Sequence, residues 1–491
     1  MSSLTKFYLV SICLFFLFGK EVFAYEKSNT KYEISAFKKS ESYTKSDSKK
    51  SNKNSKTQTK NKESEKTKQQ KKEKKKSIKE VSHKQENIKT VKKQAVSEVK
   101  EKKKEDVSII KEEVDTKNEE CFPSNESPKV SKKLQEAQFY FLFDPQTSQV
   151  LLSKNADLRI APSSMTKIMT AYVVFDQIKK GRVSLDKQCF VSKNAWRKSG
   201  SSMFLNYGDM VSIDDLLKGL LAVSGNDASI ALAEAVAGSL GNFIDLMNIK
   251  ARELNLINSH FANPHGLNEP RHYMSIRDLA YLTARFYQDF PQYAGYLGIE
   301  SFTYGKITQI NRNPLIKKHY DGILGGKTGH TDDGGYGVVG AVKRDNRMLI
   351  AVVNKARTPR LRSDTITELF DYGFANYKKY SFFNSGSEIA NLKTWLGNSP
   401  EVKAVVKDEV TFSLPITASP QNLSMKVEYK GPIYAPIKQG DKVATLIIKM
   451  NNQKVMEYPL YAKESMDKVG YFGKLNQILR YKMRIFFNKV F

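Results

Sequence analysis

Three short motifs occur in a fixed order along the chain, and they limit the folds that it can adopt. They are Ser164-Met165-Thr166-Lys167, Ser224-Gly225-Asn226 and Lys327-Thr328-Gly329. The first lies at a predicted helix start, the second between two helical patterns, and the third at the beginning of an apolar strand pattern. Each motif alone is common in unrelated proteins. All three in this order favour a domain of helices and strands in which a helix start, a turn and a strand edge face one another.

Ser164 and Lys167 have the spacing of a serine nucleophile and its base. A serine hydroxyl is a poor nucleophile until a base removes its proton. Residues three positions apart on a helix share a face, so the Lys167 amine can reach the Ser164 hydroxyl. A protonated lysine is no base, so burial and a neighbouring cation such as Lys327 must lower the pKa of Lys167. A capping serine beside a solvated lysine is the alternative for this motif taken alone.

The second and third motifs would supply the groups around the nucleophile. Ser224 would relay a proton toward the leaving amine, and Asn226 would hold the substrate amide and the Lys167 side chain. Lys327-Thr328-Gly329 would open a strand along which an extended peptide adds as a further strand. Taken alone, these motifs are also consistent with a helix-breaking turn and a surface β-turn. The patterns S-x-x-K, S-x-N and K-T-G together are typical of enzymes that acylate a serine with D-alanyl peptides or β-lactams.

The N-terminal part of the chain carries a targeting pattern and then a long polar segment. Lys6, the apolar run Phe7 to Gly19 and the small residues of Val22-Phe23-Ala24 predict a signal peptide over residues 1–24. An uncleaved anchor is the alternative, although the apolar run is short for a membrane span. Residues 25–133 are rich in Lys, Glu and Ser, contain no Arg, and carry much of the net charge of +28. This composition predicts disorder.

The same composition bears on partners and cofactors. The Lys-rich segment lacks Arg and interleaved aromatic residues, which argues against nucleic-acid binding. A solvated linker, a spacer and a segment that binds anionic wall polymer or membrane all remain open for it. The chain has six His and no H-E-x-x-H, and we interpret Glu269 and His272 as a chance pair in a loop. We therefore expect no metal and no cofactor, against the alternative of a metallo-carboxypeptidase.

Folded sequence begins near Leu134, and its periodicity predicts a mixed domain followed by an all-β domain. Over residues 134–382 we expect helices at 168–178, 213–237 (interrupted at Gly225), 278–290 and 365–377, and strands at 139–143, 149–152, within 322–342 and at 348–353. Over residues 383–465 short alternating segments predict a small β-sandwich, with strands at 402–406, 409–414, 423–429, 442–450 and 455–461.

Residues 466–491 have the pattern of an amphipathic helix. One helical face carries large apolar residues at steps of three and four: Phe472, Leu475, Leu479, Met483, Phe486 and Val490. We expect this helix to lie in the membrane interface, attracted to anionic lipid. A helix docked on the β-sandwich is the alternative. With the signal peptide, it predicts a protein that is secreted across the inner membrane and attached peripherally to the periplasmic face.

Residues 135–382 resemble the serine D-alanyl-D-alanine carboxypeptidases, the low-molecular-mass penicillin-binding proteins. The resemblance rests on the three motifs with their flanking residues, and on Pro264-His265-Gly266-Leu267 and Asp321-Gly322. It implies a β-lactamase/transpeptidase-like three-layer α/β fold, with an antiparallel sheet between helices. The all-β domain and the terminal helix also resemble that family. Ser163 stands where the family usually has Ala, a departure for which we expect little effect.

The resemblance also implies roles for residues around the catalytic set of Ser164, Lys167, Ser224 and Asn226. The backbone N–H groups of Ser164 and His330 would form the oxyanion hole. The implied substrate-binding residues are Lys327, Thr328, Gly329, His330, Arg312 and Arg362. Of these, Thr328 and Arg362 would bind the carboxylate of a terminal D-alanine. The implied reaction removes that D-alanine from peptidoglycan stem pentapeptides, with β-lactams as inhibitors.

Three other functions are weighed against this one. A β-lactamase needs a glutamate-activated water, but Asn263 to Leu267 stand where an E-x-x-x-N pattern is expected, and β-lactamases lack the C-terminal β domain. The intact catalytic set argues against a catalytically silent envelope-binding protein. A D,D-endopeptidase that cleaves cross-links uses the same residues, so the sequence leaves that alternative open.

Overall fold

The computed structural model describes residues 29–34, 128–418, 423–450 and 453–490. The predicted signal peptide and most of the predicted disordered segment lie outside the described residues. Residues 484–490 are described as helix, without their side chains.

A five-stranded antiparallel sheet forms the middle layer of the catalytic region. Its strand order is β3-β2-β10-β9-β8. The strands are β2 (Phe139–Asp144), β3 (Gln149–Lys154), β8 (Ile323–Thr331), β9 (Gly335–Arg344) and β10 (Arg347–Ala356). All six residues of β2 are buried. A strand with no polar face is expected where both faces of a sheet are covered by other layers.

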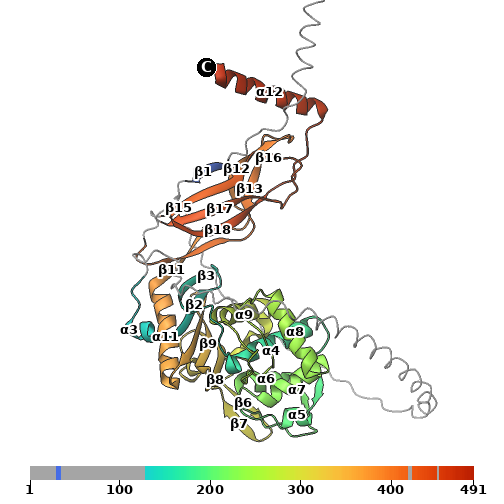
Figure 1. The fold of residues 1–491 in the computed structure, drawn as a ribbon, viewed down its shortest axis with the longest axis vertical. Coiled ribbons are helices and arrows are strands. Elements are labelled where there is room, and N and C mark those ends of the chain that lie inside the picture. The colour runs from blue at the N-terminus through green and yellow to red at the C-terminus, as the bar shows by residue number, and fades with distance from the viewer. Residues whose placement is uncertain (1–28, 35–127, 419–422, 451–452, 491) are drawn as a thin grey trace, which may run out of the picture. The chain divides into compact units, whose positions relative to one another are not determined.

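The two faces of this sheet pack against different helices (Figure 1). Phe141 and Val352 point into the core shared with α4 (Lys167–Lys179) and α9 (Ile276–Asp289), whereas Leu142 and Ala351 pack with α11 (Pro359–Asn376). Successive side chains of a strand point to opposite faces, so each strand serves both cores. The predicted three-layer arrangement, with an antiparallel sheet between helices, is confirmed.

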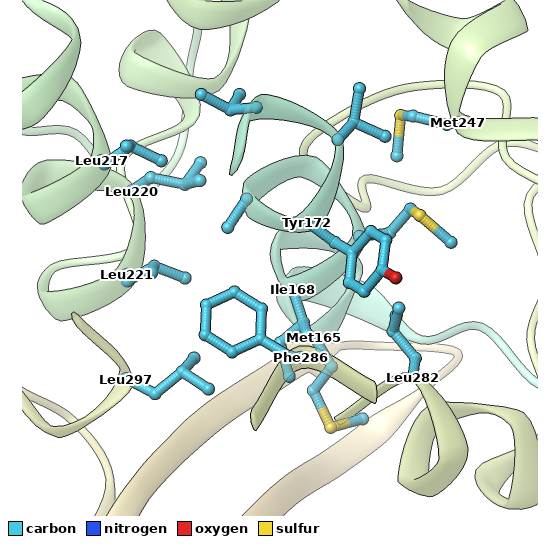
Figure 2. Packing of buried hydrophobic residues seen from close by; sticks show 14 of the residues in the cluster. Met165, Ile168, Tyr172, Leu217, Leu220, Leu221, Met247, Leu282, Phe286 and Leu297 are labelled. Atoms are coloured by element: carbon cyan, nitrogen blue, oxygen red, sulfur yellow. The ribbon is translucent and has the colours of Figure 1, made fainter. Parts of the chain in front are cut away.

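Helix α4 is the central helix of the larger core. Ten of its residues are buried, including the first, Lys167. In Figure 2, Ile168 and Tyr172 of α4 lie among side chains of three other helices: Leu217, Leu220 and Leu221 of α6 (Ile213–Ala222), Met247 of α8 (Leu240–Glu253), and Leu282 and Phe286 of α9. Close packing on all sides holds the start of α4 in place, which is where the first motif lies.

One local prediction needs correction. The helix start predicted at the first motif is instead the 3-10 turn η1 (Ser163–Thr166), and α4 follows from Lys167. The predicted interruption at Gly225 is confirmed, because α6 ends at Ala222 and α7 (Asn226–Ala237) begins directly after Gly225, while Ser224 takes a positive φ of 66° in the break. The remaining short elements of this region are β4 (Gln188–Phe190), α5 (Lys193–Trp196), β5 (Met210–Ser212), η2 (Pro291–Gly298), β6 (Ser301–Tyr304), β7 (Ile307–Ile310) and α10 (Pro314–Lys317).

The C-terminal domain is all β, as predicted. Its seven-stranded sheet has the order β1-β15-β17-β18-β13-β12-β16, and β11 pairs with β14. The bounds are β11 (Tyr377–Phe383), β12 (Glu388–Trp395), β13 (Glu401–Val406), β14 (Val410–Pro415), β15 (Leu423–Lys430), β16 (Ile433–Tyr434), β17 (Lys442–Met450) and β18 (Gln453–Ala462). The five predicted strands are present, β11, β12 and β16 were not predicted, and the predicted boundary after residue 382 falls inside β11.

The prediction of disorder over residues 25–133 is wrong at two short stretches. Asn29–Ile34 forms β1, which pairs antiparallel with β15 from Asn29↔Lys430 to Ile34↔Met425. Without β1, strand β15 would present an unpaired edge, which is a ready template for another strand. The backbone of a short polar segment can fill that edge whatever the composition around it. At the other end of the range, Lys132 and Lys133 already belong to α3 (Lys132–Glu136).

A buried polar cluster joins the β11–β14 pair to the five-stranded sheet. Arg347 Nε donates to Asp144 Oδ2 at 2.8 Å, and Arg347 Nη2 donates to Ser413 Oγ at 2.9 Å. Ser413 Oγ in turn donates to Asp144 Oδ2 at 2.7 Å, and Arg347 Nη1 donates to the Tyr377 carbonyl at 2.6 Å. Asp144 is fully buried and Arg347 is 7% exposed. The charges are therefore paired inside the protein.

Replacing Arg347 by methionine is expected to lower the free energy of unfolding by about 3–5 kcal/mol, because the Asp144 carboxylate would remain buried without its cation. Chemical denaturation monitored by circular dichroism measures this change. The control is Arg360→Met, since Arg360 is exposed and its ion pair with Asp364 spans 3.7 Å; that variant should lose at most about 1 kcal/mol. Equal losses in the two variants would contradict the assignment.

The chain ends in α12 (Tyr471–Val490), whose two sides differ. Gln477 Nε2 donates to the Gly397 carbonyl at 3.0 Å, and Tyr481 packs edge-on against Trp395. The apolar residues on the other side are exposed, with Phe472 at 84% and Leu479 at 53%. Among the described residues no single helix has the length and hydropathy of a membrane span, and the bent pair α7–α8 that passes by composition belongs to the core.

Candidate active site

The fold brings the three motifs together around the amine of Lys167. Lys167 Nζ lies 3.0 Å from Ser164 Oγ, 2.7 Å from Asn226 Oδ1 and 2.9 Å from the backbone carbonyl oxygen of His265. The Lys167 side chain is fully buried. Ser164 lies in η1 and Asn226 is the first residue of α7, so packing between the helices sets these distances. The predicted meeting of Ser164, Lys167 and Asn226 is present in the structure.

This environment favours a neutral amine. Burial lowers the pKa of Lys167 well below its ordinary value, and the charge of Lys327 lowers it further, while Asp227 opposes the shift. Arg312 and Lys198 add smaller contributions in the same direction as Lys327. A neutral amine has two N–H donors, and Asn226 Oδ1 and the His265 carbonyl are two oxygens that only accept. The lone pair then faces the Ser164 hydroxyl, which is the geometry that a general base needs.

The Asn226 amide is held in one orientation. Its Nδ2 donates to the Ser199 carbonyl at 2.8 Å, which leaves Oδ1 for Lys167. The backbone N–H of Asn226 donates to the Ser201 carbonyl at 2.7 Å. Gly200, between these two residues, has φ +95°, and a Cβ there would lie 2.6 Å from Asn226 Nδ2. The loop of residues 199–201 therefore fits closely around Asn226.

Two of the predicted site residues have buried polar atoms that lack a hydrogen-bond partner among the described residues. Ser224 is 5% exposed, and its Oγ has no hydrogen bond there. The same is true of Arg362 Nε. Leaving a buried polar atom without a partner costs about 1–3 kcal/mol, so such atoms are few and call for an explanation. A bound substrate that pairs with them would supply one.

Strand β8 carries the third motif along the edge of the five-stranded sheet. Lys327 is 3% exposed, and burial together with Arg312 and Arg362 lowers its pKa to about 7. Thr328 is buried and His330 is exposed. The His330 ring stacks on Tyr336 with ring centroids 4.0 Å apart, and the Arg362 guanidinium lies 5.9 Å from the same Tyr336 ring. The charge of Arg362 is thus placed beside the end of the motif.

Arg312 reaches the site from the segment between β7 and α10. Its Nη1 donates to Ser201 Oγ at 2.9 Å, and its side chain is exposed. Its charge lowers the pKa of both Lys167 and Lys327. Of the predicted residues, Ser164, Lys167 and Asn226 are therefore in contact, and Lys327 and Arg312 act electrostatically on Lys167.

Two glycines allow neighbouring segments to approach the turn that carries Ser164. A Cβ on Gly266, which has φ +83°, would lie 1.8 Å from the Ser163 carbonyl oxygen. A Cβ on Gly329 of β8 would lie 3.0 Å from both the Pro162 carbonyl oxygen and Ser163 Cβ. The η1 turn is therefore held between β8 and the loop of residues 263–267.

Sequence reasoning missed the support that this loop gives. His272 Nδ1 accepts from the Ala262 N–H at 3.0 Å, so Nε2 carries the proton and donates to Thr166 Oγ1 at 2.8 Å. Burial, with His260 and Lys167 nearby, lowers the pKa of His272 to about 4, which keeps the ring neutral. Glu269 and His272, interpreted above as a chance pair, join no metal group: the described part of the chain holds no set of three or more His, Cys, Asp or Glu placed for a metal. Because the oxygen that receives Lys167 is a backbone atom of His265, no side-chain motif could reveal it.

Comparisons with known proteins agree with this site. A family model described as D-alanyl-D-alanine carboxypeptidase matches residues 126–358, and one described as penicillin-binding protein 5, C-terminal domain, matches residues 377–468. The chain is 32% identical to D-alanyl-D-alanine carboxypeptidase DacF of Bacillus subtilis, over 73% of the chain and 93% of that protein. It is 33% identical to D-alanyl-D-alanine carboxypeptidase DacC of Escherichia coli, over 72% of the chain and 90% of that protein.

Solved structures of the same kind share the fold. Penicillin-binding protein 5 from Haemophilus influenzae superposes with a TM-score of 0.65 at 30% identity, over 70% of this chain and 99% of that one. Penicillin-binding protein 6B from Escherichia coli superposes with a TM-score of 0.56 at 30% identity, over 68% and 98% of the two chains. The two family models together cover the three motifs and the all-β domain. The chain belongs to the family of serine-type D-alanyl-D-alanine carboxypeptidases.

Proposed function

We propose that the protein removes the terminal D-alanine from peptidoglycan stem pentapeptides through an acyl-enzyme on Ser164. The observation that carries this proposal is the buried Lys167 amine, which lies 3.0 Å from Ser164 Oγ and has two further oxygen acceptors, Asn226 Oδ1 and the His265 carbonyl, for its N–H groups. That arrangement activates a serine without histidine or metal. It serves cell-wall maturation when the acyl group comes from the wall peptide.

The steps follow from the placement of these groups. Lys167 takes the Ser164 proton as Oγ attacks the carbonyl carbon of the penultimate D-alanine. The N–H groups of Ser164 and His330 stabilise the oxyanion that forms, each contributing about 3–4 kcal/mol to the transition state. Ser224, whose Oγ is unpaired within the described residues, passes a proton to the amine of the departing D-alanine. Water then hydrolyses the ester and returns the proton to Ser164.

The substrate is held along β8 and at its carboxylate. An extended peptide pairs with the open edge of β8, antiparallel to the strand. The terminal carboxylate meets Thr328 and Arg362, with Lys327 and Arg312 adding positive charge. The unpartnered Nε of Arg362 supports this role, because a carboxylate oxygen is the acceptor that it lacks.

Arg362→Gln is therefore expected to raise KM for a D-Ala-D-Ala peptide by about 10-fold or more, because a charge-assisted hydrogen bond to the carboxylate is lost. Steady-state release of D-alanine measures KM and kcat. A peptide with an amidated C-terminus is the control, since it has no carboxylate and should react equally slowly with both enzymes. An unchanged KM for the free acid would remove Arg362 from the site.

Penicillins are expected to form a slow-clearing ester on Ser164. Within the described residues the polar contacts of Lys167 are to Ser164, Asn226 and the His265 carbonyl, and no carboxylate stands among them to activate water. This favours a penicillin-sensitive carboxypeptidase over a β-lactamase. Incubation of the purified protein with a stem pentapeptide and, separately, with a fluorescent penicillin tests the proposal. Absence of both D-alanine release and label would refute it.

The remaining part of the proposal concerns location. A secreted protein that faces the periplasm and lies on the inner membrane surface would meet its substrate there. The exposed side of α12 supports membrane attachment, because Gln477 and Tyr481 contact the β domain and leave Phe472 and Leu479 free to enter the interface. The signal-peptide pattern over residues 1–24 supports secretion.

A double variant, Phe472→Asp with Leu479→Asp, is expected to reduce binding to anionic vesicles by about 100-fold or more, because each buried large apolar side chain contributes about 1.5–3 kcal/mol. Co-sedimentation with vesicles containing phosphatidylglycerol measures binding. Ile257→Asp is the matched control, since Ile257 is 72% exposed and lies outside α12. If the double variant and the control sediment alike, α12 is not the membrane contact.

A further inference from the structure

Ser163, the residue before the nucleophile, makes a side-chain contact that its position in the motif does not reveal. Its Oγ lies 2.9 Å from Thr331 Oγ1 at the end of β8. Ser163 is 2% exposed and has φ 50°, a left-handed conformation that residues other than glycine rarely adopt. Thr331 directly follows His330. The hydrogen bond therefore joins the neighbours of the two residues whose N–H groups form the proposed oxyanion hole.

We propose that the Ser163–Thr331 hydrogen bond is a positioning contact that holds the two oxyanion-hole donors, the N–H groups of Ser164 and His330, at their working separation. The inference rests on the proposed acyl-enzyme function and adds a residue to it. Neither Ser163 nor Thr331 needs to touch the substrate. Their hydroxyl groups act by tying η1 to β8 behind the site.

The alternation of side chains along β8 explains how the contact forms. Lys327, Gly329 and Thr331 are two residues apart, so they share one face of the strand. Gly329 has no side chain, which lets η1 approach until a Cβ there would lie 3.0 Å from Ser163 Cβ. Thr331 is the next residue on that face and meets Ser163 Oγ. Gly329 thus lets η1 approach β8 closely, and Thr331 forms the hydrogen bond with Ser163.

Other groups also pack around the hydroxyl groups of Ser163 and Thr331. Thr331 Oγ1 accepts from the Gly334 N–H at 3.0 Å, which fixes the Thr331 rotamer from the β8–β9 turn. A Cβ on Gly334 would lie 2.8 Å from Ser163 Oγ, and one on Gly266 would lie 1.8 Å from the Ser163 carbonyl oxygen. Glycines therefore surround Ser163 on three sides.

The left-handed backbone of Ser163 explains why losing the Ser163–Thr331 hydrogen bond would affect catalysis. A residue held at positive φ costs free energy and keeps that conformation only while its surroundings enforce it. Relaxation of Ser163 moves the N–H of Ser164 directly, because the two share a peptide unit. An oxyanion-hole donor must lie about 2.7–3.1 Å from the developing charge. A small displacement of the donor therefore reduces the stabilisation of the transition state more than it reduces substrate binding. The expectation from the sequence, that Ser163 in place of Ala has little effect, did not take the hydrogen bond to Thr331 into account.

The test uses the full-length enzyme and the variants Ser163→Ala, Thr331→Val and Thr331→Ser. Ser163→Ala should lower kcat for a D-Ala-D-Ala peptide and the rate of acylation by penicillin by about 5–20-fold, with KM changed less than twofold. Thr331→Val should cause a loss of the same size, and the double variant should lose no more than the larger single effect, since both remove one bond. Thr331→Ser keeps the hydroxyl and should restore wild-type rates to within about twofold.

The control for a merely structural role is Ser275→Ala. Ser275 is a fully buried serine that caps α9 by accepting from the Asp278 N–H at 3.1 Å. That variant should lower the melting temperature and leave kcat unchanged. The inference is overturned if Ser163→Ala keeps wild-type kcat and acylation rate, or if the losses in the single variants multiply in the double variant. These results differ from a failure of the proposed function, in which the wild-type enzyme itself releases no D-alanine.

Discussion

Ser164→Ala is expected to abolish D-alanine release and penicillin labelling together, with a loss in kcat of roughly 10⁴-fold or more. The alanine has no oxygen to form the ester, while the Lys167 amine and the oxyanion hole remain and account for any residual hydrolysis. The rate of D-alanine release, and mass spectrometry of the protein after exposure to penicillin, measure the two effects.

The variant should remain folded, since Ser164 is only partly buried and its Oγ lies 3.0 Å from Lys167 Nζ, a contact whose loss leaves the other partners of Lys167 in place. A near-wild-type melting temperature confirms this. Retention of the mass increase that marks the penicillin ester would show that another residue is the nucleophile.

Lys167→Arg is the second prediction with a large effect, and it tests whether Lys167 acts as a base or only supplies a positive charge. Arginine keeps the charge and its N–H donors but cannot be deprotonated in proteins. We therefore expect acylation of Ser164 to fall by about 10³-fold or more, of the size seen when a general base is lost. The second-order rate constant for a fluorescent penicillin measures it. If the arginine variant acylates at a rate near that of the wild type, the amine of Lys167 is not the base.

The pH dependence of the wild type follows with a defined sign. Lys167 is active when neutral, so kcat/KM falls as pH falls through its pKa, which burial and Lys327 hold well below the ordinary value. Lys327, with a pKa of about 7, loses its charge as pH rises through that value, and kcat/KM declines there if the charge helps to bind the carboxylate. Lys327→Gln removes a cation near Lys167 and should move the acidic limb to higher pH. A shift to lower pH would contradict the coupling.

Much of the fold could be predicted because its patterns are local. The continuous apolar runs of β2, β10 and α4 reflect burial on both faces of a strand or on all sides of a helix, which the sequence pattern records directly. Helix ends were less exact. The positive φ of Ser224 between α6 and α7 could not be predicted, because the surrounding packing decides which residue of the break bears it. The strand β1 was missed since its pairing partner, β15, lies about 400 residues away in sequence.

By itself the sequence determined which reactive groups the chain carries, namely a serine, a lysine three residues later, and the two later motifs. These groups belong to the covalent structure and do not depend on how the chain packs. Only the tertiary structure decided that the pKa of Lys167 is lowered and that its amine lies beside Ser164 Oγ, because burial, the charge of Lys327 and two acceptor oxygens come from segments distant in sequence. One acceptor is the backbone carbonyl of His265, and the bond from Ser163 to Thr331 spans 168 positions. A pKa and a hydrogen bond depend on distance in space, and that distance exists only once the chain has folded.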